Sequence, residues 1–237
     1  MKTKGIALLS ASALLAPAFA TAATPAGNMA WTFLEAGYVP TIGTDDTDVD
    51  AGQITGSIGF LGMGHAQVEY TNGTVDGNDT TFDAGSSVDF DGYRLVVGAH
   101  NQLTENTQLI GDLTYFDYSY DGGEGSDTGD VDADGFGIGL GLRHNIGSRA
   151  EVSAEVWYLD GEIDADFGGK SDVNDTIFEL RARYNWTQNL STGITAFLGG
   201  SFFGNARAFS DDGLGSDNLL RADIRWAFGN SNFSDLK

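Results

Sequence analysis

The 237-residue sequence has no cysteine, three prolines and only 12 lysines and arginines against 34 acidic residues. Without cysteine, an exported chain of this size must be stable without disulfides, which a closed, hydrogen-bonded barrel can achieve. The net charge of -22 argues against nucleic acid as a partner. After Phe19 there is no long unbroken apolar run, which excludes transmembrane helices.

The N-terminus has the pattern of a secretory signal peptide. Lys2 and Lys4 precede an apolar stretch from Ile6 to Phe19, and Ala20-Thr21-Ala22 offers a small-x-small cleavage site. A retained membrane helix is the alternative, but the apolar stretch is shorter than the ~20 residues that a span needs. We therefore predict a signal peptide over residues 1–22 and export from the cytoplasm.

Apolar and polar residues alternate with a period of two along nearly all of the remaining sequence, a pattern typical of strands with one apolar face. About ten strands are predicted: Ala30–Val39, Gln53–Phe60, His65–Thr71, Asp91–His100, Gln108–Asp117, Gly135–Arg143, Glu151–Leu159, Thr176–Asn185, Ser191–Ser201 and Leu219–Phe228. No window has a strong helical period.

The connections between these strands alternate between short and long. Outer-membrane barrels have short periplasmic turns and long outer loops, so five long and four short connections predict ten strands, with eight as the alternative. The long ones are Pro40–Gly52, Gly73–Asp89, Asp121–Asp134, Asp160–Asp175 and Gly204–Asp217. We predict an all-β, transmembrane, antiparallel up-and-down barrel over residues 23–228 and a short periplasmic tail over 229–237.

Aromatic residues recur at the strand ends beside the long loops. Such rings anchor at the depth of the lipid headgroups, so they predict a membrane-interface belt in a bacterial outer membrane. The predicted belt consists of Tyr38, Tyr70, Tyr93, Tyr115, Phe136, Tyr158 and Phe178. A soluble β-sandwich also shows one-sided alternation, but it gives no reason for aromatics to collect beside one set of loops.

The inward-facing positions carry nearly balanced charges. Unpaired charges are costly in the confined lumen of a small barrel, so near balance favours a packed network of ion pairs over a wide pore. The predicted network comprises Glu35, Glu69, Arg94, Asp112, Arg143, Glu155, Glu179, Arg181, Arg183, Arg221, Asp223 and Arg225. Glu151 shares this face. Inward glycines at 135, 137, 139 and 141 either leave room for Phe116, Tyr118 and Trp157 or simply ease strand curvature.

Two stretches carry a resemblance to a known group of proteins. Asp89 to Gly98 resembles the acid, aromatic, arginine and alternating-glycine strand of small outer-membrane barrels of the OmpA-like and Ail/OmpX-like superfamily. Leu220 to Phe228 resembles the C-terminal signal read by the barrel-assembly machinery, which the resemblance makes an expected partner. These motifs are general to the architecture and identify no particular member, and fold alone does not fix function in such barrels.

The search for chemistry gives one metal candidate and no catalytic residue. Asp130, Asp132 and Asp134 match the opening of a calcium loop, but the twelfth position, which should be glutamate, is Gly141. Weak Ca²⁺ or Mg²⁺ binding by acidic loops is the corresponding expectation, and no other cofactor is expected. His65, His100 and His144 lie at the short-turn ends, unlike the catalytic groups of the ten-stranded omptin proteases.

The sequence thus predicts a non-enzymatic outer-membrane barrel with acidic outer loops that contributes to envelope structure and surface interaction. The alternative is a narrow, cation-preferring diffusion channel. Outer-membrane lipid and lipopolysaccharide are expected partners, and no particular extracellular ligand is indicated. About two thirds of the 34 acidic residues lie in the predicted loops, which gives the outer surface a strongly negative field.

Overall fold

The computed structural model describes residues 30–39, 47–77, 87–122, 130–147, 149–165, 169–187, 189–199 and 219–228. These residues form ten strands: β1 (Phe33–Val39), β2 (Thr47–Phe60), β3 (Gly64–Gly77), β4 (Ser87–Thr104), β5 (Thr107–Gly122), β6 (Val131–Ile146), β7 (Ala150–Ala165), β8 (Gly169–Asn185), β9 (Leu190–Leu198) and β10 (Leu219–Ala227). Among them, no helix is long and apolar enough to cross a membrane.

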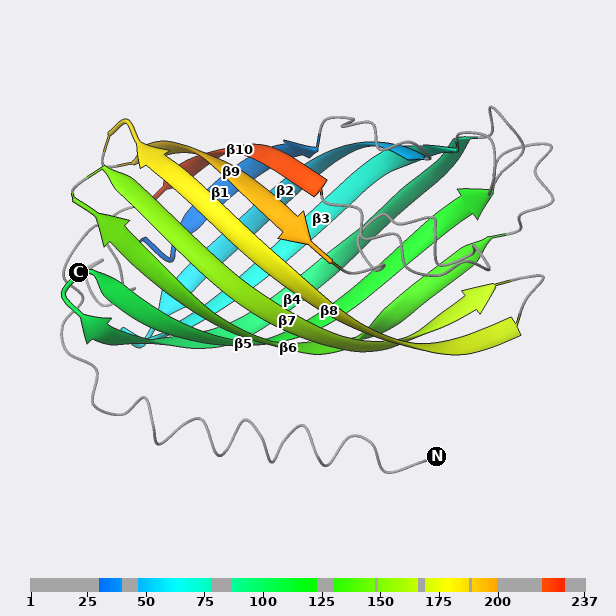
Figure 1. Cartoon of the computed structure of the whole chain (residues 1–237), viewed down its shortest axis with the longest axis horizontal. Coiled ribbons are helices and arrows are strands. Elements are labelled where there is room, and N and C mark those ends of the chain that lie inside the picture. The colour runs from blue at the N-terminus through cyan, green and yellow to red at the C-terminus, as the bar shows by residue number, and fades with distance from the viewer. Residues whose placement is uncertain are drawn as a thin grey trace, which may run out of the picture.

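Each strand pairs antiparallel with its neighbour in sequence, and β1 pairs with β10 to close the sheet into an up-and-down barrel (Figure 1). At this closure Glu35 of β1 stands opposite Arg225 of β10. Closure gives every strand a paired neighbour on both sides, so the backbone groups of the paired stretches are satisfied within the sheet, as crossing a bilayer requires. The expectation of ten strands is confirmed, and the alternative of eight is wrong.

Several strands run further toward the long connections than the sequence pattern predicts. β2 begins at Thr47 instead of Gln53, β3 ends at Gly77 instead of Thr71, and β8 begins at Gly169 instead of Thr176. The predicted loop from Asp160 to Asp175 is mostly an extension of the β7–β8 hairpin, which pairs through to Ala165 and Gly169. These extensions still alternate, because Ile163 and Val173 point inward between polar neighbours.

The outward face is apolar over the middle of the barrel, as lipid requires. Side chains such as Val97, Leu140 and Ile194 are more than half exposed, because they point away from the lumen. Six of the seven predicted belt aromatics are exposed and Tyr115 is half-buried between Tyr93 and Phe136. A second outward aromatic group, which the sequence reading did not single out, lies near the short turns: Phe60, Tyr184, Trp186, Trp226 and Phe228.

Residues 30–32 were predicted to belong to the first strand, but they precede it. Trp31 is buried inside the barrel, where its carbonyl oxygen accepts a hydrogen bond from the Ser57 hydroxyl at 2.7 Å. The Thr32 hydroxyl accepts a 3.0 Å hydrogen bond from the Gly59 amide of β2. The segment therefore turns into the lumen at the short-turn end.

Candidate functional site in the barrel lumen

The lumen is filled by two layers of side chains. The apolar layer consists of Val96, Phe116, Tyr118, Ala133, Trp157, Leu159 and Ile177. The charged layer consists of Glu35, Glu69, Arg94, Asp112, Arg143, Glu151, Glu155, Glu179, Arg181, Arg183, Arg221, Asp223 and Arg225. On β5, β6, β7 and β8, the apolar side chains lie nearer the long connections and the charged ones nearer the short turns.

All twelve residues of the predicted network face the lumen, and three of the six arginines among them converge on Glu35. Its carboxylate accepts hydrogen bonds from Arg183 Nη2 at 2.7 Å, Arg225 Nε at 2.7 Å and Arg221 Nη2 at 3.3 Å. Arg183 also donates to Asp223 Oδ1 at 2.6 Å and to the Ser191 hydroxyl at 3.1 Å. These contacts tie β1, β8, β9 and β10 together across the closing seam.

Smaller ion pairs surround this cluster. Arg143 Nη2 lies 2.6 Å from Glu151 Oε2, and Arg94 Nη2 lies 3.3 Å from Glu69 Oε2. Arg181 pairs with Glu179 at 2.5 Å, two residues along the same strand. Because these groups are largely or fully buried, their charges are exposed to little screening, and pairing is what makes their burial tolerable.

Several arginines also lie over aromatic rings. The guanidinium of Arg225 is 3.7 Å from the centre of the Phe33 ring, and that of Arg94 is 5.1 Å from the Trp157 ring. A cation over a ring face is attracted by the ring quadrupole. Arg94 thereby joins the charged layer to the apolar layer.

The inward glycines of β6 create the space that the apolar layer fills. A Cβ added to Gly139 would lie 2.8 Å from the Trp157 ring, and one added to Gly135 would lie 2.5 Å from Phe116. The expectation that these glycines accommodate large neighbours is therefore confirmed for Phe116 and Trp157. Tyr118 instead packs over Gly92 of β4, where a Cβ would lie 2.2 Å from its ring.

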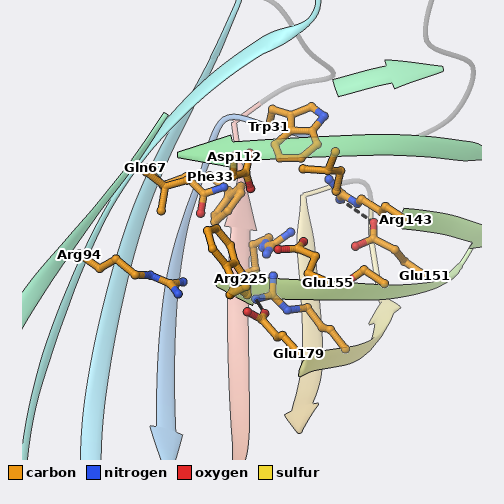
Figure 2. Close-up of a pocket in the computed structure, with 15 residues that line it drawn as sticks. Trp31, Phe33, Gln67, Arg94, Asp112, Arg143, Glu151, Glu155, Glu179 and Arg225 are labelled. Atoms are coloured by element: carbon orange, nitrogen blue, oxygen red, sulfur yellow. Dashed lines mark hydrogen bonds and ion pairs between the residues drawn. The ribbon is translucent and has the colours of Figure 1, made fainter. Parts of the chain in front are cut away.

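A cavity of about 40 Å³ lies within the charged layer, lined among others by Glu155, Glu179, Gln67 and Arg225 (Figure 2). It has room for roughly two to four water molecules. Glu155 stands opposite Glu179 on the neighbouring strand. In the described part of the chain, Glu155 has no hydrogen bond or ion pair, whereas Glu179 is paired with Arg181.

Trp31 stacks against two neighbouring histidines at the short-turn end of the lumen. Its ring lies 4.1 Å from that of His65 and 4.4 Å from that of His100, and Arg143 lies 5.0 Å from its centre. His65 Nε2 is 3.1 Å from Asp112 Oδ1. The histidines thus pack inside the barrel. The only sequence signal for the position of Trp31 is that the alternation of the first strand places residue 31 on the inward face.

The predicted calcium run does not form a cluster. Asp130 precedes β6, and Asp132 and Asp134 project outward from it and are exposed. Residues two apart in a strand are separated by roughly 6.5 Å, so an extended backbone keeps their carboxylates apart. Within the described ranges, no group of three histidine, cysteine or acidic side chains is placed to hold a metal ion.

Outward acids near the outer belt form hydrogen bonds with its tyrosines. The Tyr38 hydroxyl donates to Asp50 at 3.0 Å, and the Tyr93 and Tyr115 hydroxyls donate to Asp117 at 3.1 and 3.2 Å. Further out, Lys170 bonds Glu162 and lies 3.1 Å from Asp164. The hydrogen bonds to Glu162 and Asp164, together with their negative charge, raise the pKa of the Lys170 ammonium.

No protein-family model matches the sequence, and no curated protein matches it. Among solved structures, the KdgM porin is similar over 84% of this chain and 100% of its own, with 9% identity and a TM-score of 0.42. OmpT, an outer-membrane protein of Vibrio cholerae, is similar over 82% of this chain and 64% of its own, with 16% identity and a TM-score of 0.33. The Pseudomonas putida toluene transporter TodX covers 82% of this chain and 88% of its own, with 13% identity and a TM-score of 0.32.

These similar structures are outer-membrane barrels, and none of the likenesses is strong enough to assign a substrate to this chain. The OmpA-like and Ail/OmpX-like resemblance stays a prediction. What the chain's own strand order, lumen and apolar outer wall establish is a closed, ten-stranded antiparallel barrel of the outer-membrane type.

Proposed function

We propose that this chain is a non-enzymatic barrel of the bacterial outer membrane that has a closed lumen, contributes to envelope structure and presents acidic outer segments for surface interaction. The supporting observation is the convergence of Arg183, Arg221 and Arg225 on Glu35 across the closing seam. A conducting pore would place water between such groups. Here they bond to one another directly, and an apolar layer packs inside the wall nearer the long connections.

The remaining parts of the proposal concern export and assembly. A signal peptide over residues 1–22 would direct the chain to the periplasm, and the closing strand would be read by the barrel-assembly machinery. Outer-membrane lipid and lipopolysaccharide would surround the wall. Weak Ca²⁺ or Mg²⁺ binding by outer carboxylates is a secondary expectation, since hard cations prefer oxygen ligands.

A narrow, cation-preferring channel is the second candidate, favoured by one feature. Glu155 lines the lumen cavity without a partner in the described part of the chain, and such a carboxylate would attract cations in a hydrated pathway. In that case the lumen would have to open beyond the roughly 40 Å³ cavity.

Planar-bilayer recording of the purified full chain separates the two candidates. Folding is first verified by the shift in gel migration that folded barrels lose on heating. We expect no stable unitary current from the folded wild type or from Glu155→Gln. Stable, cation-selective unitary currents through the wild type, with lower cation selectivity in Glu155→Gln, would reject the closed-lumen proposal in favour of the channel.

A further inference from the structure

The lipid-facing wall has a shallow hollow across β6, β7, β8 and β9. Its volume is about 600 Å³, within the range of roughly 300–1,000 Å³ that is typical of ligand sites. Small and large side chains alternate around it: Ala154, Ala182 and Ala196 stand among Leu142, Val152, Leu180 and Ile194. The register explains the shape, because Ala154 lies between Leu142 and Leu180 on the flanking strands.

The edge of this hollow toward the short turns is polar and aromatic. Arg149 Nη1 donates to the Tyr184 hydroxyl at 3.3 Å, and Tyr184 lies on the same face as Ala182, two residues away. Trp186 packs edge-on against Tyr184 at 4.8 Å and donates to the Thr192 hydroxyl at 2.9 Å. His144 lines the hollow itself.

Arg149 is unusual among the described cations of this acidic protein. Six arginines face the lumen, and Lys170, on the outer side, is paired with Glu162 and Asp164. Arg149 is exposed and has no carboxylate partner among the residues that the structure describes. An exposed guanidinium that bonds a tyrosine hydroxyl but has no described carboxylate partner is suited to charge-assisted recognition of a phosphate at an aromatic membrane interface.

We propose that this hollow binds one phospholipid of the periplasmic leaflet, with an acyl chain over Ala154, Ala182 and Ala196 and its phosphate beside Arg149 and His144. The apolar floor continues into a cationic rim, which matches the order of groups in a phospholipid. β6, β7 and β8 run side by side from the short-turn end, so floor and rim form one continuous surface (Figure 1).

A second barrel is a poorer occupant than a lipid. A twofold contact would place two concave floors against each other and would bring two Arg149 rims into the same interface. Neither hollow would be filled, and like charges would be held close together. A flexible acyl chain, in contrast, can follow a shallow and irregular floor.

Native mass spectrometry of the full-length folded protein tests this site with palmitoyl-oleoyl-phosphatidylglycerol as the probe. Wild type is expected to retain one phosphatidylglycerol after excess lipid is removed, and to retain a diacylglycerol with the same chains far less well. Arg149→Gln should weaken retention about tenfold, since a charge-assisted hydrogen bond to phosphate is lost. Ala182→Phe should abolish retention by filling the floor.

Two matched variants serve as controls. Lys170→Gln removes an outward cation on the other side of the membrane, and Ala222→Phe enlarges an outward alanine outside the hollow; both should retain the lipid like the wild type. Should Ala182→Phe not fold, Ala154→Leu fills the same floor. Equal retention by all variants, equal retention of diacylglycerol, or a change in the mass of the protein assembly with no change in bound lipid would overturn the proposal.

Discussion

In the half of the lumen nearer the long connections, Phe116 and Trp157 pack over the glycines of β6, whereas in the half nearer the short turns Arg183, Arg221 and Arg225 converge on Glu35. The apolar layer depends on shape, because each large ring occupies space that a neighbouring glycine leaves free. The charged layer depends on pairing, because each buried ion is tolerable only beside its partner. One barrel wall thus supports two ways of excluding water.

The two kinds of lumen packing also lie against different strands of the barrel. Within the charged layer, the cluster centred on Glu35 lies beside the closing seam between β1 and β10, where β1 has only seven residues and β10 nine. The hydrogen bond from Arg183 to Glu35 joins β8 to β1, two strands that are not paired with each other through the backbone. The apolar layer lies against the longer strands β4 to β8, whose pairing is already extensive.

The largest effect should come from breaking the charged layer at Arg183. Arg183→Ala leaves Asp223 without the only ion-pair partner it has in the described part of the chain. Breaking a buried pair from one side typically costs about 3 to 5 kcal/mol. Urea unfolding in lipid vesicles should report a loss of this size.

Two further measurements make the Arg183→Ala result decisive. Ser191→Ala removes a neutral hydrogen-bond partner of Arg183 but leaves both ion pairs in place, and should cost about 1.5 to 3 kcal/mol, less than Arg183→Ala. Bilayer recordings made in parallel report any leak. Unchanged stability of Arg183→Ala, together with a shift toward cation selectivity, would mean that Arg183 faces water and that the lumen is a pore.

An intermediate effect is expected from overfilling the apolar layer. Gly139→Val would push a side chain into the Trp157 ring, which lies 2.8 Å from the position of the new Cβ. Overpacking of this kind costs about 1 to 3 kcal/mol. The matched control is Gly56→Val, because the nearest atom to a Cβ there is Val68 Cγ1 at 3.7 Å, an ordinary contact. Equal unfolding energies for the two variants would show that the glycines of β6 serve only curvature.

Much of this architecture could be predicted because period-two alternation is read directly from the sequence. Odd or even position within its strand assigns Leu140 to the outward face and Arg183 to the inward face. The barrel, its ten strands and the inward charges therefore follow from the sequence pattern. The acidic extensions of β7 and β8 were predicted as loops because acidic residues such as Asp160 and Asp172 are typical of solvent-exposed connections. In the structure they pair as strands, since a hairpin with an exposed face can carry polar side chains on that face.

Other features could not be predicted from the sequence because they depend on how distant strands are arranged in space. Parity places Arg183 and Glu35 in the same lumen, but 148 residues separate them, and only the closure of β1 on β10 brings them to 2.7 Å. The stacking of Trp31 against His65 and His100 likewise depends on a segment before β1 turning inward. The hollow around Ala182 depends on register across four strands, which alternation within single strands does not specify.

A smaller effect should follow when a buried pair is replaced as a unit. Arg143→Met alone leaves Glu151 without its 2.6 Å partner, whereas Arg143→Met with Glu151→Leu removes both charges. Replacing a buried pair with apolar residues of similar volume is often close to neutral. The double variant should therefore unfold near the wild-type urea concentration and well above the single variant. A double variant as unstable as the single one would show that the pair contributes more than mutual neutralisation.

The smallest effect is expected at Lys170, whose contacts with Glu162 and Asp164 lie on the exposed outer hairpin. Exposed ion pairs are screened by salt and contribute little, so Lys170→Gln should leave urea unfolding unchanged within error. Because its carboxylate partners raise the pKa of Lys170, any contribution is present at neutral pH and is lost only as the pH rises through that alkaline value. Unfolding of wild type and Lys170→Gln at low and high salt, at neutral pH, gives the measurement. A clear loss of unfolding free energy in Lys170→Gln at low salt that disappears at high salt would show that the ion pairs of this hairpin stabilise the barrel. The two lumen layers would then account for only part of its stability.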